Sequence, residues 1–590
     1  MSTQATSRSW RSFLPISVWI TSYEKGFLVP DIIAALTVWA LMVPEAMAYA
    51  SIAGMPPETG LYAALVAPLA YAIFGTSRHL NVGPSSTVAV LSFSIVGGLA
   101  AGSEPETFYA LTAGLAILTG VFFVVAGLAK LGFLADFMSR PVLAGFVVGL
   151  AMTIAAGQLH KLFGIEPTSG EYPDNFFGDI AAVLFNLDET VTATLAIGAG
   201  SLALLFVLER FMPRIPAALV VAGLAIITVT ALDLESSGVL IIGEIPAGLP
   251  SLEWPAISFE QWLGLVPGAI AIVVVGFAES VAAARTYARK YDYDVDANQE
   301  MIGLGMANAA TGIVGSFVVD GSLSKTAAAD QAGQRSQFAA LVLTAAVFVT
   351  ILFLTGLFEN LPEATLGAIV IHAVWHLIDF GKVQRYWKIR RDDFWAGLAA
   401  LLGVLIFDIL TGLLIAVGVS FLLLLARASR PRWAILGRAA VEDSDDIAYQ
   451  DVSTHPEAQT FPGLLILRFD ADLFFANANV FVDHVHEAID LADPKPSVVL
   501  LDAESVSDAD STALLVLADL RTELEAESIE FWVARVKTRL SEAAARIDGA
   551  HAHAAYPTVR AAVAAFEGRT ADAGPAPSDP ADEPDDPQEA

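Results

Sequence analysis

The stretch Asp320-Gly321-Ser322-Leu323-Ser324-Lys325-Thr326 stands at the head of one short apolar segment, and Val82-Gly83-Pro84-Ser85-Ser86-Thr87 stands at the head of another. Both stretches are rich in glycine and hydroxyl side chains, so the segments behind them make poor membrane helices. Each is the third apolar segment in its half of the chain. Short, polar-headed segments at matching places predict two related halves with broken helices. The alternative is that both stretches are ordinary loops.

Most of the chain is apolar enough to lie in a membrane. Of its 590 residues, 55 % are hydrophobic and 16 % are charged. The apolar residues form blocks of roughly 18–22, long enough to cross about 30 Å of hydrocarbon. A soluble protein with several buried helices fits so many long blocks poorly. We expect about fourteen membrane segments, at residues 30–50, 59–75, 84–101, 108–129, 141–159, 189–209, 216–232, 266–288, 300–317, 322–336, 338–357, 364–379, 393–410 and 411–427.

Lysine and arginine positions indicate the orientation, because these residues are enriched in cytoplasmic loops. With the N-terminus inside, basic clusters such as 382–391 and 427–438 lie on the cytoplasmic side, whereas acidic loops such as 166–179 lie opposite. Lys161 is the clear exception. We therefore expect a multi-pass protein of the inner (plasma) membrane, with residues 1–29 as a cytoplasmic N-terminal segment and a cytoplasmic C-terminus.

The charge of the chain is uneven. The net charge is −31, and the part from Glu442 onward holds 31 acidic and 9 basic residues, a balance of −22. This acidity disfavours nucleic acid and anionic lipid as partners, although it can also reflect a salty or GC-rich host. There is no cysteine, which excludes disulfides and thiolate metal sites. The sequence shows no Walker A motif, metal-ligand cluster or nucleophile elbow, so we expect no enzyme, metal or cofactor.

After residue 438 the pattern changes to short strands alternating with helices, which predicts a small α/β domain. The expected strands are 447–452, 464–470, 498–502 and 529–536, and the expected helices are 477–491, 511–527, 536–545 and 558–566. The resulting division is a membrane domain at 30–428, a linker at 429–445, the α/β domain at 446–567 and a disordered acidic tail at 568–590.

The two polar heads also predict an anion site. Broken helices keep backbone N–H groups free where protein or a water-filled cavity covers them, and the positive ends of their dipoles attract anions. Lys325 would add a point charge, because an ionisable residue at membrane depth is a functional candidate. Alternatively it forms an internal salt bridge with Glu279 or Glu45. The candidate substrate-binding residues are Ser85, Ser86, Ser322, Leu323, Ser324, Lys325 and Glu45.

Further motifs follow in a fixed order along residues 10–566. They are Pro57-Glu58-Thr59-Gly60-Leu61-Tyr62-Ala63-Ala64, Gly75-Thr76-Ser77-Arg78-His79, Asp296-Ala297-Asn298-Gln299-Glu300, Gln331-Ala332-Gly333, Asp472-Leu473-Phe474-Phe475-Ala476-Asn477-Ala478 and Asp508-Ala509-Asp510-Ser511-Thr512. Each is weak alone, but together they make the chain resemble the SulP sulfate-permease family of anion transporters. It departs from the family pattern at Thr59, usually Tyr or Leu, at Lys325, more often Arg, and at Ala513, often Gly.

That resemblance implies an α-helical membrane protein of seven-plus-seven inverted repeats, with a core of segments 1–4 and 8–11 and a gate of segments 5–7 and 12–14. It also implies a C-terminal STAS domain and a homodimer. Glu279, in segment 8, would occupy the position of the family's acidic coupling residue. In sodium-coupled bicarbonate relatives a threonine follows one turn later. Here that position is Ala283, so we expect Glu279 to couple protons, since a carboxyl in an apolar run readily keeps one.

Other polar residues have two interpretations each. In the family, Glu45 lies beside the substrate cavity, but it can equally be a structural carboxyl. Asn298, Gln299 and Glu300, together with Asp296, are expected to cap segment 9. Ser511 resembles the phosphorylatable serine of bacterial anti-sigma-factor antagonists, which makes it a candidate regulatory residue, yet it can equally be an ordinary N-cap.

The leading interpretation is a secondary transporter of small anions, with sulfate as the default substrate and protons as the coupling ion. It would work by alternating access between core and gate. The alternatives are a sodium-coupled bicarbonate or dicarboxylate transporter and a membrane-tethered STAS regulator. The expected partners are a small inorganic or carboxylate anion, a proton or sodium ion, the bilayer and a second copy of the chain.

Overall fold

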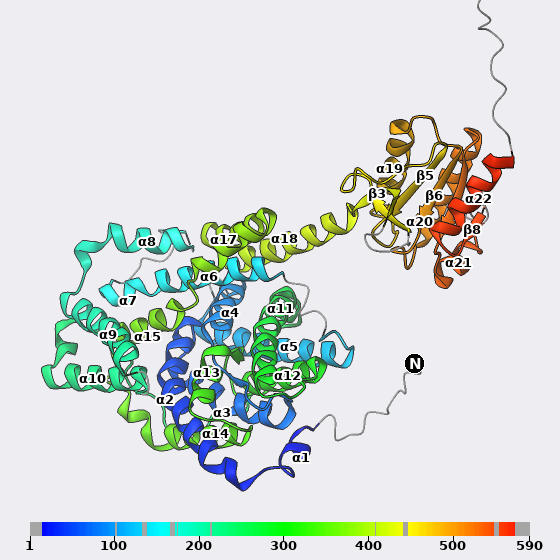
Figure 1. Ribbon diagram of the computed structural model, residues 1–590. Coiled ribbons are helices and arrows are strands. Elements are labelled where there is room, and N and C mark those ends of the chain that lie inside the picture. The colour runs from blue at the N-terminus through cyan, green and yellow to red at the C-terminus, as the bar shows by residue number, and fades with distance from the viewer. Residues whose placement is uncertain are drawn as a thin grey trace, which may run out of the picture. The chain divides into compact units, whose positions relative to one another are not determined.

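The structure is a computed structural model that describes residues 14–100, 103–132, 139–165, 172–173, 175–212, 215–407, 409–440, 447–547 and 554–572. Parts of the expected N-terminal segment and acidic tail, residues 1–13 and 573–590, lie outside the described residues. The chain divides into two compact units between Phe421 and Leu422. Each unit is described by itself (Figure 1).

The first unit is helical, and each expected membrane segment coincides with one helix. In the first half these helices are α2 (Leu28–Ile52), α3 (Pro57–Phe74), α4 (Ser86–Leu99), α5 (Pro105–Leu128), α6 (Arg140–Gly157), α9 (Thr192–Phe211) and α10 (Ala217–Leu232). In the second half they are α11 (Phe259–Lys290), α12 (Ala297–Ile313), α13 (Leu323–Gln331), α14 (Phe338–Val349), α15 (Glu363–Trp375), α17 (Arg391–Ile406) and α18 (Ile409–Ser429).

Helix length separates the two broken segments from most others. Within the described part of the chain, eight helices are long and apolar enough to cross a membrane, and α4 is among the shorter apolar ones. Helix α13 ends at Gln331, before the expected residue 336, because the chain turns at Gly333 with a φ of +98°. The remaining short elements are α1 (Ile16–Trp19), α7 (Leu159–Phe163), α8 (Phe176–Phe185), α16 (Phe380–Ile389), the 3₁₀ turns Lys25–Phe27, Leu187–Glu189, Leu234–Ser237 and Thr355–Leu357, and the π turn Thr350–Leu354.

Packing sorts the helices of the first unit into two groups. One group joins α2, α3, α4 and α5 to α11, α12, α13 and α14, and the other joins α6, α7, α8, α9 and α10 to α15, α16 and α17. These groups correspond to the expected core and gate. Helix α2 links them, since it packs against both α10 and α15.

Glycine allows two helices of the core group to touch at their backbones. A Cβ atom at Gly120 of α5 would lie 2.7 Å from the carbonyl oxygen of Gly305 in α12, and a Cβ at Gly305 would lie 2.7 Å from the carbonyl oxygen of Gly120. Small residues at such crossings are typical of membrane helices, which gain stability from close packing rather than from apolar burial.

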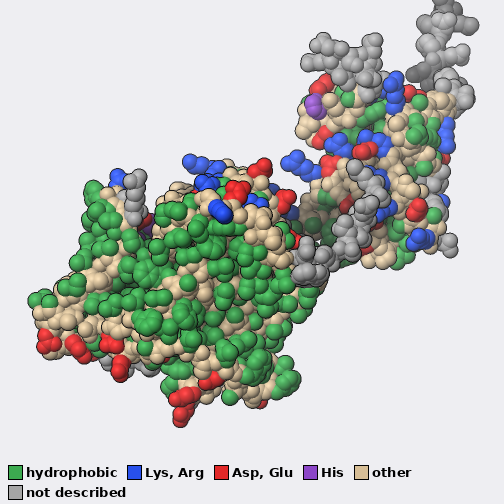
Figure 2. Space-filling model, turned by 90° about the horizontal axis from the view of Figure 1, so that it is seen from below, with side chains coloured by type: hydrophobic (Ala, Val, Ile, Leu, Met, Phe, Trp, Pro, Cys, Tyr) green, Lys and Arg blue, Asp and Glu red, His purple; other side chains and the backbone are tan. Residues whose placement is uncertain are grey.

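The surface of the first unit is typical of a protein surrounded by lipid. Figure 2 shows a broad hydrophobic face, with acidic side chains gathered along one edge and lysine and arginine along the opposite edge. Large apolar side chains such as Phe211 and Phe353 are exposed, which a water-soluble surface tolerates only in small patches.

The second unit is a six-stranded sheet with helices on it, in the strand order β4-β3-β5-β6-β7-β8. Strands β5 to β8 are parallel, whereas β3 is antiparallel to both β4 and β5. The elements are β3 (Trp433–Ala440), β4 (Ile447–Asp451), β5 (Leu464–Phe469), α19 (Ala478–Leu491), β6 (Val498–Asp502), α20 (Ser511–Ala526), β7 (Glu530–Ala534), α21 (Thr538–Ala544), β8 (Ala554–Tyr556) and α22 (Val559–Asp572).

Strand β3 falls inside residues 429–445, where the sequence predicted a linker. The sheet therefore begins before residue 446. The strand forms because Ala434 and Leu436 are buried against apolar residues of β5 and β6. The strand directly follows Arg430-Pro431-Arg432 and contains Arg438, so it gave little sequence signal for this pairing. Strand β8 was also not predicted, and α22 continues to Asp572, into the range expected for the tail.

Candidate functional site

The two broken helices begin side by side. Strand β1 (Asn81–Gly83) precedes α4 and pairs antiparallel with β2 (Asp320–Ser322), which precedes α13. In this register Asn81 lies opposite Ser322, and Gly83 lies opposite Asp320. The pairing satisfies backbone groups that would otherwise be costly away from water. It also holds the N-terminal ends of α4 and α13 close to each other.

The start of α13 presents hydroxyl groups around a capped N-terminus. Ser322 is the N-cap, and its oxygen accepts a long hydrogen bond of 3.4 Å from the backbone N–H of Lys325. The hydroxyls of Ser322 and Ser324 lie 3.0 Å apart. Ser324 and Leu323 are exposed, so the first turn of this helix is accessible to a solute.

The start of α4 differs in its side-chain bonding. Ser85 is the N-cap residue but makes no capping bond, and its hydroxyl lies beside the carboxyl of Asp320 without a well-formed hydrogen bond among the described residues. It is half-buried, whereas Ser86 is buried. A hydroxyl without a well-formed hydrogen bond at a helix N-terminus is suited to bind an added polar group.

Lys325 connects the two helix starts. Its side chain is 2 % exposed, and Nζ donates a hydrogen bond of 3.0 Å to the carbonyl oxygen of Pro84. Nζ also lies 3.0 Å from Oε2 of Glu45 and 5.1 Å from the ring centre of Tyr49. Of the two salt bridges that the sequence allowed for Lys325, the one with Glu45 is present.

Two further carboxyl groups, of Glu279 and Asp320, interact with each other, and that of Asp320 also interacts with this lysine. Glu279 of α11 is partly exposed, and Asp320 of β2 is 2 % exposed. A Cβ atom at Gly276 would lie 3.6 Å from Cβ of Asp320, so this face of α11, which also carries Glu279 three residues later, is turned toward β2. The adjacent Ser280 accepts a hydrogen bond of 2.8 Å from the backbone N–H of Gly321.

Asp320 was not among the candidate residues predicted from the sequence. Its carboxyl interacts electrostatically with Glu279 and Lys325, yet neither of its oxygens accepts a well-formed hydrogen bond within the described chain. Buried carboxylates normally accept several bonds. The available signal was its place at the head of the polar stretch 320–326, together with Lys325, which was singled out as an ionisable residue at membrane depth.

The acidic motif at the start of α12 bonds to neighbouring segments and does not contribute side chains to the anion site. Asp296 caps α12 by accepting from the N–H of Asn298 at 2.9 Å. Asn298 accepts from the N–H of Gly132, and Gln299 donates to the carbonyl of Phe74. Glu300 is buried, and the bonds it accepts come from the side chains of Tyr71 and Thr76 and from the N–H groups of Thr76 and Ser77. These three residues therefore tie α12 to other elements instead of capping it.

In the second unit, Asp510 rather than Ser511 caps α20. The Asp510 side chain accepts from the N–H of Ala513 at 2.8 Å and from the N–H of Phe475 at 2.9 Å. Ser511 is the exposed first residue of the helix. The interpretation of Ser511 as an ordinary N-cap is thus wrong, because the preceding carboxylate is the better acceptor for the free N–H groups.

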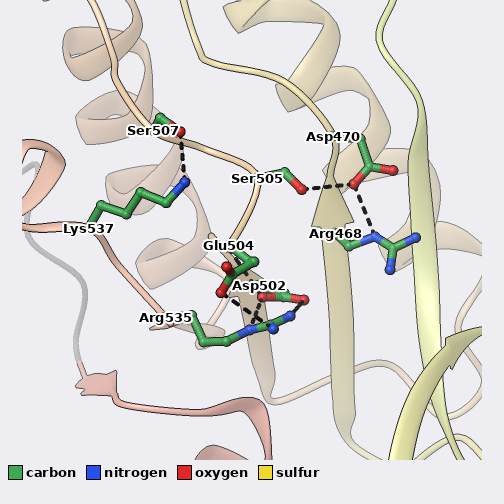
Figure 3. Close-up of polar contacts among 8 residues, drawn as sticks. All are labelled: Arg468, Asp470, Asp502, Glu504, Ser505, Ser507, Arg535 and Lys537. Atoms are coloured by element: carbon green, nitrogen blue, oxygen red, sulfur yellow. Dashed lines mark hydrogen bonds and ion pairs between the residues drawn. The ribbon is translucent and has the colours of Figure 1, made fainter.

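Polar contacts at the carboxyl ends of β5, β6 and β7 stabilise the same unit (Figure 3). The fully buried carboxylate of Asp502 is paired with Arg535, which also lies 3.4 Å from Glu504. Lys537 donates to Ser507 at 2.7 Å. A buried carboxylate needs such a partner, so this arrangement has a structural explanation.

A well-formed cavity of the first unit does not coincide with the paired helix starts. It measures about 610 Å³ and is lined by residues of the N-terminal segment, by Thr76, Ser77 and Arg78, and by Arg335. None of the predicted substrate-binding residues lines it, and of the predicted structural residues it includes Asp296 and Gln299. The site between α4 and α13 is therefore defined by polar groups rather than by volume.

Comparisons with known proteins agree with this architecture. The model of the sulfate permease family matches residues 28–400, and that of the STAS domain matches residues 455–562. A probable sulfate transporter of Mycobacterium tuberculosis is 36 % identical over 575 residues, covering 96 % of this chain and 99 % of the relative. The chain belongs to the sulfate permease family. It is thus a multi-pass membrane transporter with a STAS domain, and not an enzyme.

More distant members and solved structures support the family fold. A probable sulfate transporter of Arabidopsis thaliana is 30 % identical over 547 residues, 89 % of this chain and 85 % of the relative. The structure of murine Solute Carrier 26 family member A9, an anion transporter in the inward-facing state, matches with a TM-score of 0.87 at 24 % identity, over 96 % of each chain. The transmembrane domain of the cyanobacterial bicarbonate transporter BicA matches with a TM-score of 0.58 at 24 % identity, over 67 % of this chain and 99 % of that one.

Proposed function

We propose that the protein is a proton-coupled secondary transporter of small oxyanions, with sulfate as its main substrate. The observation that carries this proposal is the pairing of β1 with β2, which brings the starts of two broken helices and Lys325 together. Two helix N-termini supply free N–H groups and a positive potential without needing a matching ligand shape. That arrangement suits an anion rather than a cation or a neutral solute.

The anion would bind where the hydroxyl groups are accessible. Ser324 is exposed, and the Ser85 hydroxyl makes no well-formed hydrogen bond among the described residues, so both can replace part of the hydration shell of an oxyanion. The backbone N–H groups of the first turns of α4 and α13, including Ser86 and Leu323, would complete the shell. Lys325 contributes its charge from below the surface, since it is almost fully buried.

Glu45 reduces the attraction that Lys325 exerts on an incoming anion. The ion pair of 3.0 Å between them cancels most of the field that an incoming anion would feel. An anion therefore competes with the Glu45 carboxylate for Lys325. This competition keeps the empty site from holding an uncompensated positive charge in the membrane.

The carboxyls of Glu279 and Asp320 form the proposed coupling pair. Two neighbouring carboxylates repel each other strongly in a water-poor site. The pair of carboxyls therefore favours the state that holds one proton. A proton on either carboxyl would also supply the donor that the oxygens of Asp320 lack among the described residues. Binding of an anion nearby adds negative charge and would strengthen proton uptake, which links the two fluxes.

Transport would follow from movement of the core group against the gate group. All of the site residues, from Glu45 in α2 to Lys325 in α13, belong to the core group. Helix α2 packs against α10 and α15 of the gate group. Glu45 therefore lies on the helix that joins the core group to the gate group. A core that carries its ligand past a fixed gate is a common solution for transporters with broken helices.

The orientation and location are proposed from charge. The separation of acidic and basic edges in Figure 2 supports a cytoplasmic N-terminus and STAS domain in the cell's inner membrane. The homodimer rests on the family resemblance. Sulfate as the substrate is supported by the names of the bacterial and plant relatives.

Uptake by proteoliposomes tests the proposal. Purified protein would be supplied with labelled sulfate, bicarbonate, nitrate and succinate, each with an inward proton gradient, an inward sodium gradient or neither. We expect sulfate to accumulate with the proton gradient and sodium to have no effect. A requirement for sodium would contradict proton coupling. It would also show that a sodium site tolerates alanine at position 283. Anion binding without flux would instead indicate a membrane-tethered regulator.

A further inference from the structure

A second cluster of ionisable side chains lies far along the chain from the anion site. Glu209 is in the last turn of α9, His372 is in the last turn of α15, and His376 follows as the C-cap of α15. One ligand atom from each residue lies within 4.8 Å of the other two. Nε2 of His372 is 2.9 Å from Oε2 of Glu209, and Nε2 of His376 is 2.9 Å from Oε1.

The geometry of the two histidines is that of a metal-binding pair. Their spacing of four residues places both imidazoles on one face of the helix, as in many zinc sites. Their ring planes are at 89° and their centres are 5.8 Å apart. Phe206 of α9 packs edge-to-face on the His372 ring, with centres 5.0 Å apart, which restricts the orientation of that ring.

Two of the three distances between ligand atoms are already close to those around an ion, and all three lie within 4.8 Å. A tetrahedral zinc with bonds of about 2.0–2.1 Å keeps its ligand atoms about 3.3 Å apart. The two nitrogen–oxygen distances of 2.9 Å are within a few tenths of an ångström of that value. His376 and Glu209 are exposed by 56 % and 41 %, so water can fill a fourth position and an ion can enter.

The electrostatic surroundings also favour a cation. Both α9 and α15 end at this cluster, and each helix C-terminus carries a partial negative charge. Two imidazoles and one carboxylate are a ligand set preferred by zinc and other late first-row ions, whereas magnesium and calcium prefer oxygen alone.

We propose that Glu209, His372 and His376 bind one zinc ion, or a similar transition-metal dication, that joins the C-terminal ends of α9 and α15. Both helices belong to the gate group, so the ion would fix one helix of the gate to another. The site is separate from the anion site, which lies in the core group. The sequence named no metal ligands because Glu209 is separated from His372 by 163 residues.

Zinc binding by the full chain tests this proposal. Metal-free protein in detergent, without a polyhistidine tag, would be titrated with zinc in competition with a chromophoric chelator. We expect one ion per chain and a rise in melting temperature, since the metal binds only the folded state. E209Q, H372N and H376N should each weaken zinc binding at least about 10-fold. Magnesium and calcium should leave the melting temperature unchanged.

H455N is the matched control, because His455 also pairs with a carboxylate, Glu457, at 3.0 Å but belongs to no group of three potential metal ligands among the described residues. It should bind zinc as the wild type does. Equal zinc affinity in the wild type, E209Q and H372N would overturn the proposal. If a variant does not fold, X-ray absorption of the zinc-loaded wild type decides: two imidazoles with oxygen ligands support the site, and a shell without imidazole contradicts it.

Discussion

The starts of α4 and α13 share a backbone arrangement but differ in side-chain chemistry. Each helix follows a short strand of the same two-stranded sheet. In α13, Ser322 caps the helix, Lys325 lies in the first turn and Asp320 precedes it. In α4, the N-cap hydroxyl of Ser85 makes no well-formed hydrogen bond among the described residues, and the first turn holds no acidic residue. Both halves thus supply backbone N–H donors at a helix start, whereas the charged side chains at these helix starts come from the second half.

That charge is nevertheless stabilised by the first half. Lys325 donates to the carbonyl of Pro84 and pairs with Glu45, and both partners precede α5 in the chain. The lysine is buried only because these two groups are present. The anion site therefore exists only once both halves have folded together.

The largest expected effect is the loss of Lys325. In K325M the site loses its cation and leaves the Glu45 carboxylate unpaired, so anion uptake should fall about 100-fold or more. Labelled sulfate uptake by proteoliposomes measures this. K325R keeps the charge and should retain clear activity, although its planar head cannot reproduce both contacts of the ammonium. The double variant K325M/E45Q should recover stability but not transport. Wild-type uptake in K325M would refute the view that the second half supplies the necessary charge.

The next effect concerns the two carboxyls that distinguish the second half. E279Q and D320N should each reduce proton-driven accumulation about 10-fold while leaving exchange of labelled for unlabelled sulfate intact. The reason is that an amide can fill the site but cannot take up and release the proton. The dependence of uptake on external pH should become flat in both variants.

E300Q is the control for this pair, since Glu300 is as buried as Asp320 but accepts bonds from Tyr71, Thr76 and Ser77. It should lower the melting temperature and leave the pH dependence unchanged. If D320N kept the wild-type pH dependence while E279Q lost it, Glu279 would act alone and Asp320 would be structural.

The comparison also shows what the sequence could predict. Hydrophobic blocks located every membrane helix, because length and apolarity are local properties. The polar heads located both broken helices for the same reason. The pairing of β1 with β2 depends on contacts between residues about 240 positions apart (Asn81 with Ser322, for example), and no local pattern encodes it.

The misses have the same physical cause. Strand β3 was assigned to a linker because its burial depends on β5 and β6, and the Glu209–His372 contact joins two separate helices. Asp320 is different: it stands in the polar stretch 320–326 that the sequence singled out, but its importance follows from Glu279 and Lys325 lying nearby. The roles of Asn298, Gln299 and Glu300 as links to other elements likewise needed the fold.

A moderate effect is expected for Glu45, the first-half partner of the lysine. E45Q removes the carboxylate that competes with the anion, so the KM for sulfate should fall about 5-fold, which corresponds to about 1 kcal/mol. Uptake measured over a range of sulfate concentrations gives this value. E58Q, at the start of α3, is a suitable control because Glu58 has no ion pair with Lys325. A higher KM in E45Q would mean that Glu45 assists binding directly instead of competing.

The smallest effects separate the two caps. S322A removes a side-chain cap and should lower stability by about 1 kcal/mol, seen as a lower melting temperature. S85A removes a hydroxyl that does not cap its helix and lies beside Asp320, so the melting temperature should change less than in S322A while the KM for sulfate rises about 2-fold. Ser85 would then be available to the substrate because it is not needed by its own helix. The opposite result, a destabilised S85A with an unchanged KM, would show that both serines cap alike and that the two helix starts do not differ in the way proposed.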